Sequence, residues 1–295
     1  MGTRGVGDDC APSYTLSQGI DYEGAFISAT LAKGWAVVVS DYEGLGTPGL
    51  HTYMVGPSQG HAVLDAARAA QRLPEAGLAA DGPIGIMGYS QGGGAAGWAA
   101  ELAGSYAPEL DVVGTVAGGV PGDLTATAEF LDGSPFVGFA LMAALGLDAA
   151  YPELDLDAYL NADGEALVAR AQTLCLVSVD GFATVLDTLF ADIDAFVTTN
   201  PLGTPAWQAR LEEVRLGDVA PSAPVFQFHG VVDEIVPFPQ AAELRREWCD
   251  RGATVTWTTL PGEHLLGLVE GHPLGLSWLS ARFAGIPTVG TCWLP

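Results

Sequence analysis

The sequence has few basic residues. Its 295 residues include 11 lysines and arginines against 35 aspartates and glutamates, and the formal net charge is −24. Lys33 is the one lysine. Because nucleic acids and anionic membrane surfaces are bound through positive charge, this imbalance argues against both as partners. The excess of acid is typical of a soluble protein surface.

Long apolar runs are also missing. No stretch of the sequence reaches the roughly 18 apolar residues that a membrane-spanning helix needs, and no signal peptide is recognisable at the start. We therefore expect no transmembrane segment. If the protein is secreted, its export signal lies outside this numbering.

Cysteine is scarce, with four residues at positions 10, 175, 249 and 292. None of them forms a CxxC or a Cys/His spacing of the kind that binds zinc, so we expect no metal site. An even number of widely spaced cysteines favours two disulfides in a secreted protein over four buried thiols in a cytosolic one.

Strand-like and helix-like segments alternate along most of the chain. Predicted strands cover residues 35–40, 83–87, 112–117, 224–229 and 253–260, and predicted helices cover 60–73, 94–105, 240–250 and 272–283. The run at 35–40 is apolar and β-branched, which predicts a strand buried on both faces. Such alternation is typical of a mainly parallel sheet flanked by helices, the α/β class.

The alternation breaks between residues 121 and 220. This stretch contains helix-like apolar segments at 136–147 and 167–176, separated by proline and glycine breaks. We interpret it as an inserted helical cap, with 1–120 and 221–295 forming the α/β core.

One short motif, GYSQGGG at 88–94, carries chemistry. It places Ser90 at the corner between a predicted strand and a predicted helix, with Gly88 and Gly92 on either side. A nucleophile at such a corner has a strained backbone, and the glycines leave room for it. G-x-S-x-G by itself is a common pattern, so its partners matter.

A serine hydroxyl is a weak nucleophile that needs a base, and the base needs an orienting carboxylate. In hydrolases with this corner, the acid and then the histidine follow the serine on loops after late strands. Asp233 follows the predicted strand 224–229, with Glu234 a weaker choice. His264 lies in the loop after the predicted strand 253–260, which predicts the triad Ser90, Asp233 and His264.

The remaining histidines fit other roles. His229 is interpreted as a structural residue that bonds locally at a strand end, and His272 as the start of a helix. His51 and His61 precede the serine and fit no triad order.

An oxyanion hole needs two preorganised donors. The first is the backbone N–H of Gln91, directly after the nucleophile. The second is expected from a glycine-rich loop after an early strand, and residues 1–7 have that composition although no strand precedes them.

Several stretches together resemble the secretory lipases of the Candida antarctica lipase A type, in particular their actinobacterial branch. They are GTRGVGDDCAPSY, GWAVVVSDYEGLG, GYSQGGG, ELAGSYAPELDVVGTVAGG, FLDGSPFVGFAL, HGVVDEIVP and GEHLLGL. The resemblance implies an α/β-hydrolase fold with Ser90 as nucleophile, Asp233 as acid and His264 as base. It also implies a cap that shapes an acyl tunnel, and disulfides Cys10–Cys175 and Cys249–Cys292.

The sequence departs from the family at its N-terminus. Bacterial members usually read His-Gly-Thr in the oxyanion loop, and Met1 stands here in the place of the histidine. The resemblance assigns the second oxyanion donor to Thr3. The N-terminal strands that lead into this loop in the family are expected to be missing.

These observations predict a lipase that cleaves medium or long acyl glycerides through an acyl-enzyme and needs no metal or organic cofactor. Phe136, Phe139 and Met142 are candidates for the acyl pocket. The alternative enzyme is a carboxylesterase for short-chain, bulky synthetic or polyester substrates. The alternative from a different functional class is a non-catalytic binding protein on the same fold. The expected partners are a lipid or small-molecule ester and a lipid–water interface, and the expected location is extracellular.

Overall fold

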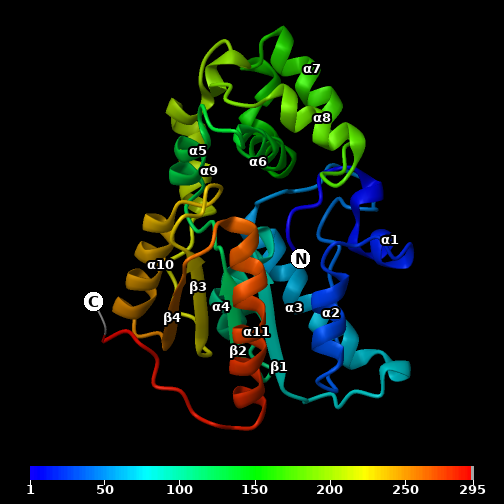
Figure 1. Ribbon diagram of the computed structural model, residues 1–295, viewed down its shortest axis with the longest axis vertical. Helices are drawn as coiled ribbons and strands as arrows, with labels where there is room; N and C mark the ends of the chain where they lie inside the picture. The colour runs from blue at the N-terminus through cyan, green and yellow to red at the C-terminus, as the bar shows by residue number, and fades with distance from the viewer. Residues whose placement is uncertain (294–295) are drawn as a thin grey trace.

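Four parallel strands form the sheet in the computed structural model, which describes residues 1–293 (Figure 1). They are β1 (Ile84–Tyr89), β2 (Val112–Gly118), β3 (Val225–Gly230) and β4 (Val255–Leu260), and they lie side by side in chain order. All three neighbouring pairs are parallel. β3 is buried along its whole length, as expected for a strand covered on both faces. The predicted α/β class is confirmed.

Helices cover both faces of the sheet. On one face α3 (Gly56–Arg72), α4 (Gln91–Tyr106) and α10 (Phe238–Asp250) pack around an apolar cluster that includes Trp248 and Val255. On the other face α11 (His264–Phe283) packs against Phe226, Phe228 and Leu260 (Figure 1). α2 (Gly24–Leu31) lies against α11 through Phe26, and α1 (Pro12–Ser17) precedes it.

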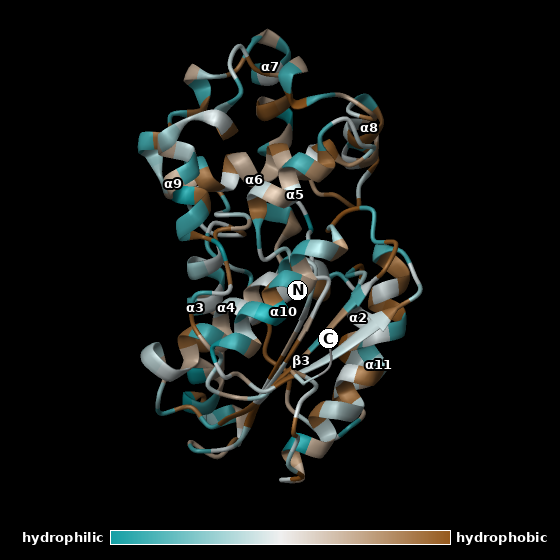
Figure 2. Ribbon diagram, turned by 90° about the vertical axis from the view of Figure 1, so that its left-hand side faces the viewer, coloured by the Kyte–Doolittle hydropathy of each residue, from teal (hydrophilic) through white to brown (hydrophobic). Residues whose placement is uncertain are grey.

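All regular elements between β2 and β3 in the described chain are helical. They are α5 (Leu124–Leu131), α6 (Val137–Ala150), α7 (Ala162–Ala171), α8 (Val179–Asp187), α9 (Pro205–Glu213) and short 3-10 turns. Both ribbon views place these helices at one end of the molecule, beyond the carboxyl ends of the strands (Figures 1 and 2). The loops that end β1, β3 and β4 therefore face this helical layer.

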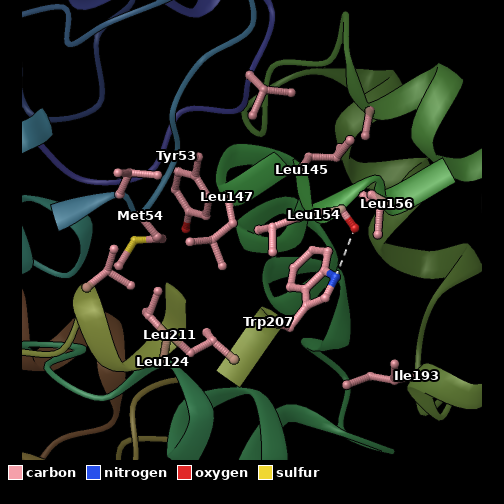
Figure 3. Packing of buried hydrophobic residues seen from close by; sticks show 14 of the residues in the cluster. Tyr53, Met54, Leu124, Leu145, Leu147, Leu154, Leu156, Ile193, Trp207 and Leu211 are labelled. Carbon is pink, nitrogen blue, oxygen red and sulfur yellow. Dashed lines mark hydrogen bonds between the residues drawn. The ribbon is translucent and has the colours of Figure 1, made fainter. Parts of the chain in front are cut away.

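The helical layer has an apolar core of its own, drawn in Figure 3. Trp207 of α9 is 1% exposed, and its indole N–H donates to the carbonyl of Leu154 at 3.3 Å. Tyr53 and Met54, from the loop before α3, belong to the same cluster. Because these two residues come from outside segment 121–220, the helical layer is packed onto the rest of the molecule.

The prediction of a strand at 35–40 is wrong. This segment has no regular secondary structure, and Val38 is 49% exposed. Its apolar residues read as a buried strand, but strand structure requires a ladder of backbone hydrogen bonds. No strand among residues 1–293 pairs with this segment.

Two predicted helix boundaries are also wrong. The last helix begins at His264 and not at His272, because the carboxylate of Glu263 accepts hydrogen bonds from the N–H groups of Leu265 and Leu266 and so caps it there. His272, predicted as the start of the helix, lies inside α11. The predicted helix at 167–176 ends at Ala171.

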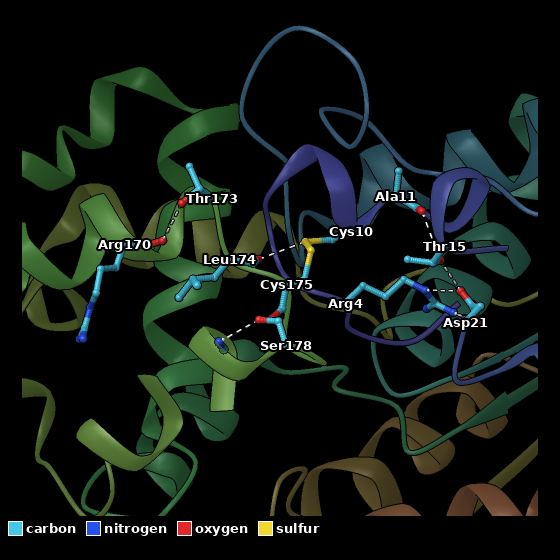
Figure 4. The surroundings of a disulfide bond; sticks show 11 residues. Arg4, Cys10, Ala11, Thr15, Asp21, Arg170, Thr173, Leu174, Cys175 and Ser178 are labelled. Atoms are coloured by element: carbon cyan, nitrogen blue, oxygen red, sulfur yellow. Dashed lines mark hydrogen bonds and ion pairs between the residues drawn. A yellow bond between two sulfur atoms is a disulfide. The ribbon is translucent and has the colours of Figure 1, made fainter. Parts of the chain in front are cut away.

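Residues 174–176 instead run beside the N-terminal loop. The amide of Leu176 donates to the carbonyl of Arg4 at 2.7 Å, and that of Val6 donates to Leu174 at 3.2 Å. The Cys10–Cys175 disulfide joins the same two segments (Figure 4). A second disulfide joins Cys249 at the end of α10 to Cys292. These pairs are the ones that the family resemblance implies.

Within residues 1–293 no single helix is long and apolar enough to cross a membrane. By length and composition alone, one sharply bent pair, Val137–Ala150 with Pro152–Ala158, meets the same test.

Candidate active site

Ser90 forms the turn between β1 and α4. Its backbone has φ 56° and ψ −122°, a conformation that non-glycine residues rarely adopt. A Cβ atom on Gly88 would lie 1.9 Å from the carbonyl oxygen of Gly92, and one on Gly92 would lie 2.8 Å from the backbone nitrogen of Met1. Close approaches of the backbone therefore explain both glycines of the motif.

Three side chains form a continuous hydrogen-bonded chain at the carboxyl end of the sheet. His264 Nε2 lies 3.0 Å from Ser90 Oγ, and His264 Nδ1 lies 2.7 Å from Asp233 Oδ2. A carboxylate only accepts, so Nδ1 carries the proton and donates it to Asp233. The Nε2 lone pair is then free to accept the Ser90 hydroxyl proton.

Asp233 is suited to remain ionised. Burial opposes its charge, but hydrogen bonding by His264 and by the backbone N–H of Val236 outweighs that effect and holds the pKa of Asp233 below its ordinary value. The amides of Ile235 and Val236 both donate to its second oxygen, at 3.0 and 2.8 Å. Glu234 has a different contact: its carboxylate accepts the backbone N–H of His264 at 3.0 Å.

His264 is the first residue of α11, where the sequence analysis expects a loop. Tyr89, the last residue of β1, donates its hydroxyl proton to the carbonyl of His264 at 2.5 Å, and the two rings lie 5.1 Å apart. Glu234 therefore holds the backbone N–H of His264, and Tyr89 holds its carbonyl. The backbone of His264 is thereby held on both sides of its Cα atom.

The other histidines are placed as follows. His229 Nε2 lies 2.9 Å from the carbonyl of Val236, a local contact at the end of β3, and 3.4 Å from Asp233. His272 lies inside α11 against Phe26, and His61 packs against Tyr106. His51 is 1% exposed and lies 3.1 Å from the side chain of Gln91.

An apolar cavity of about 410 Å³ opens beside Ser90 and His264. Thr3 and Gln91 line it, and the Thr3 amide has no acceptor within residues 1–293. Residues of segment 121–220 form much of the remaining wall, namely Leu124, Thr127, Ala128, Leu131, Phe139, Ala140 and Ala143. Of the three acyl-pocket candidates only Phe139 lines this cavity. Phe136 and Met142 line a smaller cavity of about 60 Å³, which Phe139 and Leu176 also border.

A buried ionic cluster supports the loop that carries Thr3. Arg4 pairs with Asp21 at 2.7 Å and with Glu23 at 3.2 Å. Glu23 also accepts the backbone N–H of Gly2, and Tyr22 donates to the carbonyl of Thr3. No motif or spacing in the sequence links residues 21–23 to the loop, so this cluster was not predicted.

No group of three or more His, Cys, Asp or Glu side chains is arranged to hold a metal ion in the part of the chain that the structure describes. The site holds a serine hydroxyl, an imidazole and a carboxylate beside an apolar cavity.

Residues 11–291 match the family described as secretory lipase. This chain belongs to the secretory lipase family. Among its relatives, the secreted triacylglycerol lipase LIP5 of Malassezia furfur is 31% identical, with 95% of this chain and 76% of the relative covered. A protein of Mycobacterium tuberculosis named probable inactive lipase MT1628 is 34% identical, with 96% and 66% covered.

The X-ray structure of Candida antarctica lipase A in its closed state superposes with a TM-score of 0.87 at 32% identity, covering 99% of this chain and 71% of that one. The family match and the α/β-hydrolase fold confirm the resemblance to secretory lipases of the Candida antarctica lipase A type, and the actinobacterial branch stays a prediction. The chain spans 64% of the length of several relatives that it matches.

Proposed function

We propose that this chain is a serine hydrolase that cleaves carboxylic esters of lipids. The observation that carries the proposal is the hydrogen-bonded chain from Asp233 through His264 to Ser90, which ends at an apolar cavity. An apolar cavity with a few convergent polar groups is the usual form of a site for a small organic substrate.

In the first half of the reaction, His264 Nε2 takes the proton of Ser90 Oγ while Oγ bonds to the acyl carbon. The C=O electron pair moves onto oxygen, and the N–H groups of Gln91 and Thr3 hold that oxyanion, each contributing about 3 kcal/mol. When the tetrahedral intermediate collapses, the ester C–O bond breaks and His264 returns the proton to the leaving alcohol.

In the second half, a water molecule replaces the alcohol. His264 removes its proton as the oxygen attacks the acyl carbon, and Ser90 leaves with the proton restored. Asp233 keeps the imidazole in the tautomer that accepts at Nε2 and stabilises the imidazolium. These steps need no metal or organic cofactor.

Segment 121–220 is proposed to be a cap inserted into a core formed by 1–120 and 221–295. In its support, α5 and α6 contribute apolar residues to the wall beside Ser90. We place the acyl chain against Phe139. A longer chain would continue toward Phe136 and Met142, since the smaller cavity lies past the same side chain.

Two alternative functions are tested against the proposed lipase activity. A carboxylesterase would use the same triad with short or bulky acyl groups. A non-catalytic protein would retain the fold alone, and the relative named a probable inactive lipase is the reason to test for it.

The experiment compares initial rates on p-nitrophenyl esters of two to sixteen carbons for the wild type and Ser90→Ala. A rate that holds or rises beyond ten carbons supports a lipase, and a maximum at two to four carbons supports a carboxylesterase. Retained hydrolysis in Ser90→Ala overturns the assignment of the nucleophile. A wild type that cleaves no ester and does not react with an organophosphonate supports the non-catalytic reading.

The mouth of the cavity carries exposed apolar side chains. Val177 and Leu265 line the cavity and are 70% and 68% exposed. Val179, Phe182 and Phe190, in and after α8, are 86%, 63% and 69% exposed. Exposed apolar side chains of this kind mark interaction sites. We propose that these five residues, called the rim below, contact a lipid–water interface. Two disulfides and a relative named as secreted support an extracellular location.

The rim is tested with the Phe182→Asp/Phe190→Asp double variant on an emulsified ester and on a dissolved ester. We expect the ratio of emulsified to dissolved rate to fall at least fivefold. Val289→Asp is the matched control, because Val289 is 90% exposed in the segment after α11. Its neighbour Gly290 lies against Val255, the first residue of β4, at the amino end of the sheet. An unchanged ratio in the double variant removes Phe182 and Phe190 from the docking surface.

A further inference from the structure

His51 lies beneath the nucleophile turn, although its position before Ser90 excludes it from the triad order. Its side chain is 1% exposed and that of Gln91 is 2% exposed. His51 Nε2 lies 3.1 Å from the side-chain nitrogen of Gln91, and His51 Nδ1 lies 2.7 Å from the carbonyl oxygen of Glu43. Gln91 is the residue whose backbone N–H is the first proposed oxyanion donor.

These two contacts define the protonation state of His51. A carbonyl oxygen only accepts, so Nδ1 carries a proton and donates it to Glu43. The Nε2 lone pair then accepts from the Gln91 amide. Burial lowers the pKa of His51, which is consistent with a neutral ring. Both ring nitrogens and the buried Gln91 NH₂ group are thereby satisfied.

The second proposed donor is supported from the same turn. The hydroxyl of Tyr53 lies 2.8 Å from Oγ1 of Thr3, and the backbone N–H of Tyr53 donates to the carbonyl of His51 at 2.8 Å. The rings of His51 and Tyr53 lie 6.0 Å apart. Residues 51 and 53 therefore contact both residues that carry the proposed oxyanion donors, Gln91 and Thr3.

We propose that His51 is a positioning residue for the oxyanion hole. It tethers the side chain of Gln91 at the start of α4 and, through Tyr53, fixes the spacing between the amides of Gln91 and Thr3. Donors act on an oxyanion only when they lie about 2.7–3.1 Å from it, so a small displacement of one amide weakens catalysis. This inference rests on the proposed ester hydrolysis.

The first test is His51→Phe, which keeps a ring in the buried site but removes both nitrogens. We expect kcat on a dissolved p-nitrophenyl ester to fall about 10- to 100-fold while KM changes less than threefold, because the lost interaction acts on the transition state. His51→Gln keeps one donor and one acceptor and should recover at least threefold of the loss. The phosphonylation rate of Ser90 should follow kcat.

His272→Phe is the matched control, since His272 is also a buried histidine but packs on Phe26 and lines no part of the cavity. Its kcat should stay within twofold of wild type. A folded His51→Phe protein with unchanged kcat overturns the inference, and so does a loss that His51→Gln does not recover.

Gln91→Met by itself covers the case in which His51→Phe does not fold, and an unchanged kcat in folded Gln91→Met overturns the inference. Gln91→Met removes the side-chain amide but keeps the backbone N–H, and it should lower kcat to a similar degree. In a folded double variant the losses should not add, because both changes break one contact. Losses that add overturn the inference. Ser90→Ala distinguishes failure of this inference from failure of the proposed function. If the proposed function fails, Ser90→Ala and the wild type hydrolyse the ester at the same rate.

Discussion

Ser90 Oγ lies 3.0 Å from Nε2 of His264, although 174 positions separate the two residues in the chain. Two strand ends create this contact: Ser90 follows β1, and His264 follows the short loop after β4. Because parallel strands place their carboxyl ends at the same edge of the sheet, residues that follow distant strands meet there.

Asp233→Asn should lower kcat by about 10³- to 10⁴-fold, because an amide no longer holds the imidazole in the tautomer that accepts at Nε2. Glu234→Gln is the comparison, since Glu234 contacts only the backbone N–H of His264 in the described structure, and we expect it to lower kcat less than tenfold. Steady-state rates on a dissolved ester measure both. A larger loss for Glu234→Gln would reassign the acid.

Gly88→Ala should destabilise the protein by more than about 2 kcal/mol or prevent folding, because its Cβ would lie 1.9 Å from the carbonyl oxygen of Gly92. Gly24→Ala is the control. No atom lies within 4 Å of a Cβ built on Gly24, at the start of α2, and alanine is the better helix former there. Denaturant unfolding compares the two, and equal stability of both variants contradicts the close approach.

We expect the free energy of unfolding to depend on pH through the buried side chain of Glu101. Burial raises its pKa to about 7 from the ordinary 4.5, even though its carboxylate accepts from Trp248 Nε1 and the amide of Gly217. A carboxyl whose folded pKa is raised binds more protons in the folded state. Its contribution to stability is therefore full below pH 4.5 and falls by about 3 kcal/mol as the pH rises through 7.

Thermal unfolding of wild type and Glu101→Gln between pH 4.5 and 8 checks this contribution. The wild type should lose more stability than the variant over this interval, because the variant has no proton to release at that position. Parallel curves for the two proteins would show that Glu101 does not titrate in this window.

The two disulfides should differ in their contribution to stability. Cys10–Cys175 closes a loop with a sequence separation of 165, and Cys249–Cys292 one of 43. Loss of chain entropy in the unfolded state then predicts contributions to the free energy of unfolding of about 5 kcal/mol for the first and about 4 kcal/mol for the second. The double alanine variant of the first pair should lose about 1 kcal/mol more free energy of unfolding than that of the second. Denaturant unfolding without reductant decides, and the reverse order contradicts the prediction.

Local sequence was sufficient for the class of fold, and it selected the three side chains that the structure brings into one hydrogen-bonded chain, Ser90, Asp233 and His264. G-x-S-x-G marks a sharp corner after a strand, and the order of acid and histidine after late strands pointed to His264 and to Asp233, with Glu234 as the weaker choice. The hydrogen bond from the His264 ring goes to Asp233. Short apolar runs bounded by turn residues, such as 83–87, predicted strands, because a strand covered on both faces presents no polar side. Helix ends were harder, since the last helix was predicted to start at His272 but is capped by Glu263 and starts at His264.

Tertiary structure alone decided which segments pair and which side chains meet across the chain. Residues 35–40 are apolar and β-branched, but a strand needs a neighbour to bond with, and periodicity carries no information about neighbours. The same holds for Arg4 with Glu23 and for His51 with Gln91. Their residue types are ordinary and their separations irregular, so only the folded backbone brings them within hydrogen-bonding distance.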